Sequence, residues 1–95
     1  MAFVNLSLQI VPVVPEEQIY PVVDAVIQFI DSMKVAYEVG PMETTMEGEL
    51  EDLLKIVLGA QKICTDLGVD RVLSIVKIDY RKTGITIDEK IHKYR

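Results

Sequence analysis

The sequence predicts an α+β fold in which an antiparallel four-stranded sheet carries two helices on one of its faces. Residues 3–11 alternate apolar and polar side chains, as a half-buried strand does. Two later segments, about 16–34 and 49–67, repeat apolar residues at helical spacing. Short β-forming runs lie at 35–47 and 71–80. The resulting order, β-α-β-β-α-β, is typical of the ferredoxin-like sandwich, whose second sheet face stays open.

The first strand and the first helix are separated by prolines. The apolar face of the strand is formed by alternate residues, Val4, Leu6, Leu8 and Ile10. Pro12 and Pro15 end the strand because proline cannot donate a hydrogen bond to a sheet ladder. Glu16 and Glu17 then favour a helix start, since carboxylates are stabilised at the positive end of the helix dipole. The expected apolar face of this helix is Val22, Val23, Val26, Ile27, Ile30 and Met33.

The middle of the chain predicts a hairpin followed by the second helix. Residues 35–47 contain two short strands joined by a tight turn at Gly40–Pro41. The second helix starts near Glu49, and Gly68 is expected to be its C-cap. Its expected apolar face is Leu50, Leu53, Leu54, Val57, Ala60, Cys64 and Leu67.

The fourth strand, within the run 71–80, is apolar on both faces. Val72, Val76 and Ile78 share one side, and Leu73 and Ile75 share the other. Such incomplete alternation indicates burial on both sides of the sheet. The chain is 49% hydrophobic, and its mean hydropathy of +0.25 is high for a small monomer. We therefore expect a homodimer or homotetramer joined partly through the open sheet face. A turn at 82–84 and a short helix at 88–94 complete the prediction.

Length and charge restrict the partners. Ninety-five residues make one domain, which we assign to 1–95. Residues 1–70 hold 12 acidic and 3 basic side chains, whereas residues 71–95 hold 3 acidic and 7 basic ones. An acidic body disfavours nucleic acid, so the basic tail is expected to meet the acidic body of the same or a neighbouring subunit.

The expected location is the cytoplasm. No apolar run approaches the roughly 18–20 residues that a membrane span requires, so a membrane partner is not expected. The N-terminus lacks the basic and long apolar regions of a signal peptide. A single cysteine, Cys64, cannot form an intramolecular disulfide and suits a reducing compartment.

The reactive residue types do not form a catalytic set. The single histidine, His92, is expected to be solvated near the C-terminus, and Cys64 to be an inert buried thiol. One cysteine cannot supply a C-x-x-C metal site, and no nucleophile–base–orienter set can be assembled. We therefore expect a non-catalytic protein that uses no cofactor.

Several segments in order resemble the small thiamine-binding protein family related to the YkoF-type proteins. The main similarity is GPMETTMEGE at residues 40–49. The other matching pieces are Val11–Pro12, Ile19–Tyr20–Pro21, Gly68 with Arg71–Val72, Lys77–Ile78–Asp79–Tyr80 and Ile87–Asp88–Glu89–Lys90. The resemblance covers nearly the whole chain. It implies a ferredoxin-like fold, dimers that pair into tetramers, and a pocket for thiamine or hydroxymethylpyrimidine.

The residues of the predicted strands tolerate such a ligand. An aminopyrimidine presents an adjacent donor and acceptor, which hydroxyls and amides can pair, and a partly buried carboxylate favours a thiazolium cation. The first strand is expected to be central, flanked by the third and fourth, so polar groups of all three can converge. The candidate ligand-binding residues are Asn5, Ser7, Thr44, Thr45, Glu47, Lys77 and Asp79.

Other interpretations of these residues stay open. Thr44 and Thr45 alternate in direction, so at most one of them faces a pocket. Glu47 is either a ligand carboxylate or a helix-start carboxylate, and Lys77 with Asp79 is either part of a pocket or an interfacial ion pair. The alternative function is a structural or protein-interaction module that uses its open sheet for oligomerisation and binds no small ligand.

Overall fold

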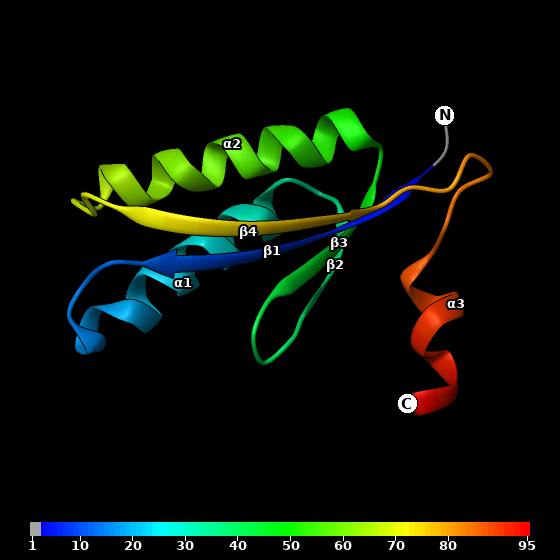
Figure 1. The fold of residues 1–95 in the computed structure, drawn as a ribbon, viewed down its shortest axis with the longest axis horizontal. Helices are drawn as coiled ribbons and strands as arrows, with labels where there is room; N and C mark the ends of the chain where they lie inside the picture. Colours follow the sequence, from blue (N-terminus) through cyan, green and yellow to red (C-terminus); the bar gives the residue numbers. More distant parts are fainter. Residues whose placement is uncertain (1–2) are drawn as a thin grey trace.

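The computed structural model describes residues 3–95 and has the predicted order of elements (Figure 1). The strands are β1 (Val4–Pro12), β2 (Ala36–Val39), β3 (Thr44–Gly48) and β4 (Val72–Asp79). The helices are α1 (Glu16–Ser32), α2 (Leu50–Asp66) and the short α3 (Ile87–Ile91), which continues into a 3₁₀ turn at His92–Tyr94. No helix within residues 3–95 is long and apolar enough to cross a membrane.

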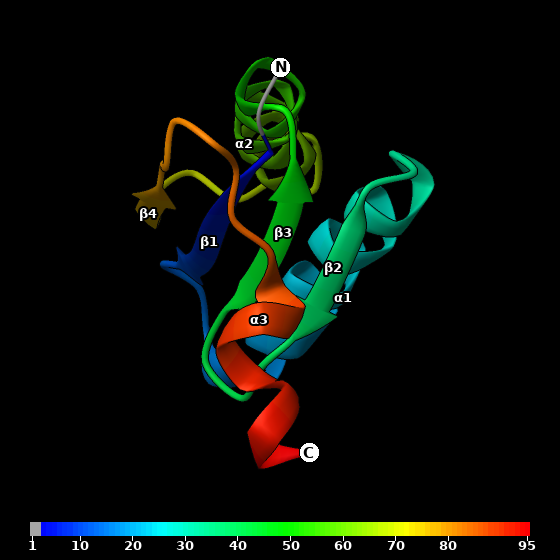
Figure 2. The same ribbon diagram turned by 90° about the vertical axis from the view of Figure 1, so that its right-hand side faces the viewer.

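The four strands form one antiparallel sheet in the order β2-β3-β1-β4. β1 is therefore central between β3 and β4, as predicted. Helices α1 and α2 cover one face of the sheet, whereas α3 lies beyond the other face, near its β2–β3 end (Figure 2). This architecture confirms the predicted ferredoxin-like α+β fold and leaves most of one sheet face open.

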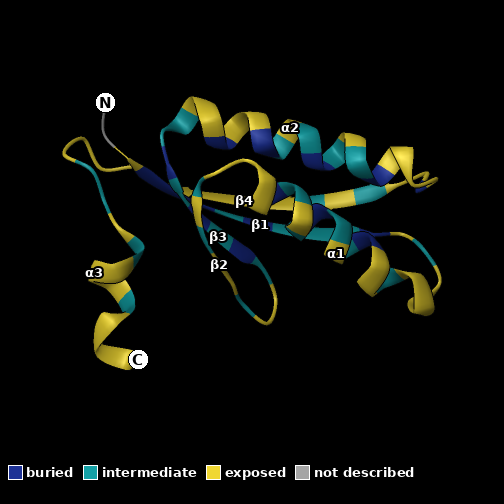
Figure 3. Cartoon of the chain, turned by 180° about the vertical axis from the view of Figure 1, so that it is seen from behind, coloured by how far each residue is buried: buried dark blue, intermediate teal, exposed yellow. Residues whose placement is uncertain are grey.

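The core lies between the sheet and helices α1 and α2 (Figure 3). Alternate residues of β1 and β3 point into it, and the two helices meet them with one apolar stripe each. The buried side chains are Val4, Leu6, Leu8, Met46, Val22, Val26, Ile30, Leu53, Ile56, Ala60, Cys64 and Val69. Burial of each large aliphatic side chain contributes about 1.5–3 kcal/mol, so this stripe-on-sheet contact is the main stabilising feature.

The buried face of α2 differs from the predicted apolar face. Ile56 is fully buried although the sequence analysis did not place it on this face, whereas Leu54 and Leu67 are 41% and 56% exposed. Met33, assigned to the inner face of α1, is likewise 39% exposed. The reason is geometric: a flat sheet touches only a limited arc of each helix, so apolar residues at the margins of the stripe stay in solvent.

The predicted hairpin turn is confirmed, and α2 ends as predicted near Gly68, although its C-cap is Leu67. The backbone N–H of Gly40 donates to the carbonyl oxygen of Glu43 at 2.7 Å and closes the β2–β3 hairpin. Gly68 follows α2 with φ of +87°, a left-handed conformation that glycine adopts without steric penalty. Its N–H donates to the carbonyl oxygen of Thr65 at 3.0 Å.

β4 exposes apolar side chains on both faces within one copy of the chain. Leu73 and Ile75 on the open face are each 50% exposed, and Val76 and Ile78 on the other face are 36% and 45% exposed. The two-sided burial expected for this strand is therefore not provided by the chain itself. The basic C-terminal segment, in contrast, does contact the acidic body, since Arg95 pairs with Glu38 at 2.7 Å.

Candidate functional site

A row of three polar residues crosses the open face of the sheet. In the strand register, Asn5 of β1 lies between Glu47 of β3 and Asp79 of β4. Directly paired residues of antiparallel strands point to the same face, and here that face is opposite the helices. We call these three residues the carboxylate row, since an amide is flanked by two carboxylates.

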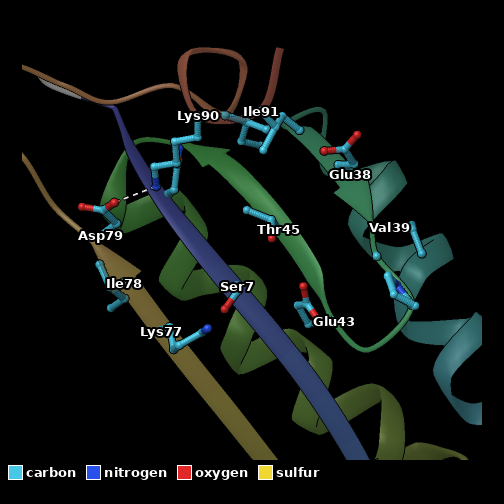
Figure 4. A pocket seen from close by; sticks show the side chains of 14 residues that line it. Ser7, Glu38, Val39, Glu43, Thr45, Lys77, Ile78, Asp79, Lys90 and Ile91 are labelled. Carbon is cyan, nitrogen blue, oxygen red and sulfur yellow. Dashed lines mark ion pairs between the residues drawn. The ribbon is translucent and has the colours of Figure 1, made fainter. Parts of the chain in front are cut away.

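A second row lies two residues further along β1. Ser7 is paired with Thr45 on one side and with Lys77 on the other. We call these three residues the hydroxyl row. Glu38 of β2 continues it, since Glu38 pairs with Thr45. Figure 4 shows the ammonium of Lys77 directed along the sheet toward Ser7. The two rows together make one half of the open face polar.

The two rows, except for Glu47, form the floor of a hollow of about 750 Å³, within the range of roughly 300–1,000 Å³ typical of small-molecule sites. Its walls come from two further segments. The β2–β3 turn contributes Glu43, and α3 contributes Ile87, Lys90 and Ile91 (Figure 4). The hollow therefore combines hydrogen-bonding groups from the sheet with apolar side chains from α3, as ligand pockets generally do.

Asn5 is the most deeply buried polar residue that lines the hollow, with 3% of its surface exposed. Its Nδ2 donates to the carbonyl oxygen of Ile85 at 3.3 Å. Its Oδ1 is also buried, and no donor among residues 3–95 lies within hydrogen-bonding distance of it. A buried acceptor without a partner costs about 1–3 kcal/mol, so this oxygen is an acceptor suited to a donor from a bound molecule.

The charges around the hollow are only partly paired. Asp79 Oδ2 forms an ion pair with Lys90 Nζ at 2.6 Å, and Glu38 pairs with Arg95. Glu43 and Lys77 line the hollow without an ion-pair partner within residues 3–95. The hollow can thus accept and donate hydrogen bonds and offers charge of both signs. In the same part of the chain, no group of three or more His, Cys, Asp or Glu side chains is placed to hold a metal ion.

The structure brings five of the seven predicted residues together at the hollow: Asn5, Ser7, Thr45, Lys77 and Asp79. Thr44 is not among them. It is paired with Leu8, points toward the helices and is 6% exposed. The alternation of a strand sends neighbouring side chains to opposite faces, and the hairpin register selects Thr45 for the open face.

Glu47 lies on the open face but does not line the hollow. Its Oε1 accepts a hydrogen bond from the backbone N–H of Ile87 at 2.6 Å. Glu47 thus contacts the first residue of α3, Ile87, and not the start of the adjacent helix α2, whose N-cap is Glu49. Asp79 pairs with Lys90, and the interfacial role considered for Lys77 and Asp79 stays a prediction.

The residues that sequence reasoning missed are Glu38 and Glu43 near the hairpin and Ile87, Lys90 and Ile91 on α3. The spacing of the two isoleucines with Lys90 between them was the available signal for α3, because residues three and four apart share a helix face. Nothing local indicated which part of the sheet that face would meet.

The chain is similar in sequence to a known protein family over most of its length. A family model described as thiamine-binding protein matches residues 6–95. A UPF0045 protein of Clostridium perfringens is 59% identical over 91 residues, which are 96% of this chain and 96% of the relative. The UPF0045 protein YqgV of Bacillus subtilis is 34% identical over 59 residues, 61% of this chain and 57% of the relative.

Solved structures are similar over the same length. A domain of unknown function from Bacillus cereus superimposes with a TM-score of 0.92 at 47% identity, covering 99% of this chain and 91% of that one. A Thermotoga maritima protein assigned provisionally to thiamine biosynthesis or salvage superimposes with a TM-score of 0.93 at 38% identity. That match covers 98% of this chain and 99% of the Thermotoga chain.

Proposed function

The chain belongs to the thiamine-binding protein family, and we propose that its open-face hollow binds thiamine, or the hydroxymethylpyrimidine half of thiamine, without changing it chemically. The observation that carries this proposal is the unpartnered, buried Oδ1 of Asn5 in the floor of a hollow of ligand size. The Thermotoga structure, with its provisional link to thiamine metabolism, supports the same ligand class.

The pyrimidine ring fits the hydrogen-bonding groups of the floor. The exocyclic amine of an aminopyrimidine donates, and the Oδ1 of Asn5 is an acceptor that lacks a donor. The adjacent ring nitrogen accepts, and the hydroxyls of Ser7 and Thr45 in the neighbouring row can donate to it. We expect these contacts to orient the ring and to be shared by thiamine and hydroxymethylpyrimidine.

The thiazolium ring of thiamine carries a permanent positive charge, which hydroxymethylpyrimidine lacks. The carboxylates of Glu43 and Asp79 lie on the walls of the hollow and would favour that charge. We therefore expect thiamine to bind more tightly than its pyrimidine half.

The direct test is titration of the purified protein with thiamine and hydroxymethylpyrimidine by calorimetry, after mass spectrometry of any small molecule that co-purifies. Binding of both, with thiamine the tighter, would support the proposal. Absence of binding by both at millimolar concentration would refute it. Mass spectrometry after incubation should recover the ligand unchanged, and a new product that depends on the protein would indicate an enzyme instead.

We propose in addition that the chain assembles as a homodimer or homotetramer. The exposed apolar residues of β4, above all Leu73 and Ile75 on the open face, favour a second copy as the covering surface. Light scattering at micromolar concentration tests this, and a monodisperse monomer would refute it. Assembly without any ligand binding would favour the interaction-module alternative. The buried free thiol of Cys64 agrees with the cytoplasm as the proposed location.

A further inference from the structure

All three members of the carboxylate row are held by the C-terminal segment, residues 85–95. The carbonyl oxygen of Ile85 accepts from Asn5, and the N–H of Ile87 donates to Glu47. Lys90 pairs with Asp79 at 2.6 Å. The two hydrogen bonds join residues that are 80 and 40 positions apart in the sequence. The segment therefore crosses the sheet along this row and contacts each of its polar side chains.

α3 is internally ordered but weakly anchored. Thr86 and Glu89 form a capping box, and Arg81 pairs with Glu89 at 2.9 Å, which fixes the orientation of the helix start. None of the residues of α3 is buried. A helix of five residues has little stability of its own, and the Lys90–Asp79 pair is 36% and 51% exposed at its two side chains. Exposed pairs of this kind contribute little to stability, so the Lys90–Asp79 pair adds little to the free energy that holds the segment on the sheet.

We infer that the C-terminal segment is a displaceable strap, whose Lys90 ammonium occupies at Asp79 the position that a cationic ligand would take. This inference rests on the proposed function, since it concerns the charge of the ligand in the same hollow. Lys90 and the ligand cation then compete for one carboxylate. Release of the strap also frees the carboxylate of Glu47 from Ile87, which makes the row doubly anionic and more attractive to a cation.

The competition multiplies the apparent affinity for a cation by the fraction of molecules in which the strap is open. Because the ion pair is half-exposed, this reduction should be small, about two- to fivefold. A ligand without a fixed positive charge gains little from access to Asp79. The competition therefore acts mainly on the cationic part of the ligand, whereas Ser7 and Thr45 of the hydroxyl row, to which the strap forms no hydrogen bond among residues 3–95, recognise the pyrimidine with or without the strap in place.

The test compares the wild type with Lys90→Met, using thiamine and hydroxymethylpyrimidine as probes in calorimetry. Lys90→Met should bind thiamine about two- to fivefold more tightly and change hydroxymethylpyrimidine affinity less. Lys93→Met is the matched control, because it removes the same charge from the same segment, and Lys93 lies over the Tyr94 ring, 5.2 Å from its centroid, rather than at Asp79. This control should bind both probes as the wild type does.

Hydrogen exchange provides a second readout in the unmodified protein. Competition predicts that thiamine accelerates exchange of the Ile87 amide, because binding releases the strap. A lid that closes over the ligand would slow that exchange, and this result would overturn the inference. Unchanged or weakened thiamine binding by Lys90→Met, while the wild type binds, would overturn it as well. If neither protein binds either probe, the proposed function itself has failed.

Discussion

Replacement of Asn5 by leucine should separate stability from ligand binding. Leucine has the same number and branching of side-chain heavy atoms as asparagine, but its side chain can neither donate nor accept a hydrogen bond. The substitution removes the hydrogen bond from Nδ2 to the Ile85 carbonyl at 3.3 Å. It also removes the buried Oδ1, which has no hydrogen-bond partner among residues 3–95. Both changes affect the free energy of unfolding, and they have opposite signs.

The magnitudes favour a neutral or stabilising outcome. A typical hydrogen bond contributes about 0.5–1.5 kcal/mol net, whereas an unsatisfied buried polar atom costs about 1–3 kcal/mol. The Ile85 carbonyl is only part-buried, so water can replace its lost donor. The difference between the two ranges runs from about −0.5 to about +2.5 kcal/mol, and solvation of the Ile85 carbonyl favours its upper part, so we expect Asn5→Leu to stabilise the protein by up to about 2.5 kcal/mol. Urea unfolding followed by circular dichroism measures this change.

Binding should respond in the opposite direction. Loss of the acceptor for the pyrimidine amine should weaken thiamine and hydroxymethylpyrimidine alike, by about 0.5–1.5 kcal/mol or roughly two- to tenfold. Thr44→Val is the matched control, since Thr44 is similarly buried but faces the helices, and it should leave both affinities unchanged. Destabilisation of Asn5→Leu by more than about 2 kcal/mol would show that Oδ1 is satisfied in the free protein. Unchanged affinity for both ligands would refute its role in binding.

Three further outcomes follow from the local packing and electrostatics. Gly59→Ala should lower the melting temperature despite the better helix propensity of alanine, because an added Cβ would clash with the ring of Phe29 at Cζ, and Phe29→Leu should relieve the loss. Gly68→Ala should destabilise by about 1 kcal/mol in urea unfolding, because φ there is +87° and no contact gain offsets the strain; an unchanged midpoint would contradict this. The hydrogen bond from the Thr86 N–H is the main cause that lowers the pKa of Glu89. The ionised carboxylate of Glu89 therefore stabilises α3 fully at pH values above the ordinary glutamate pKa of about 4.3, and this stabilisation is lost as the pH falls through the lowered pKa. The protection factors of the α3 amides, which are exchange rates corrected for the intrinsic effect of pH, should therefore fall at acidic pH, and Glu89→Gln should abolish that dependence.

The order of elements and the polar face of β1 were predictable from the sequence because both depend on local properties. The alternation of Leu6 and Leu8 with Ser7 fixes which side of β1 faces the helices, whatever strand lies beside it. Proline and glycine ended the segments close to the predicted positions because their effects on the backbone need no distant partner. The same patterns were sufficient to identify five of the residues that line the hollow.

The tertiary structure alone decided how the site is completed. The hairpin register, not the composition of the segment, put Thr45 rather than Thr44 on the open face. The C-terminal segment crosses the carboxylate row through contacts that span up to 80 residues, so no local pattern could place Lys90 at Asp79. Likewise, the unpartnered oxygen of Asn5 arises only when β3, β4 and that segment enclose it together. Periodicity determines which face a side chain takes, whereas long-range packing determines what that side chain meets.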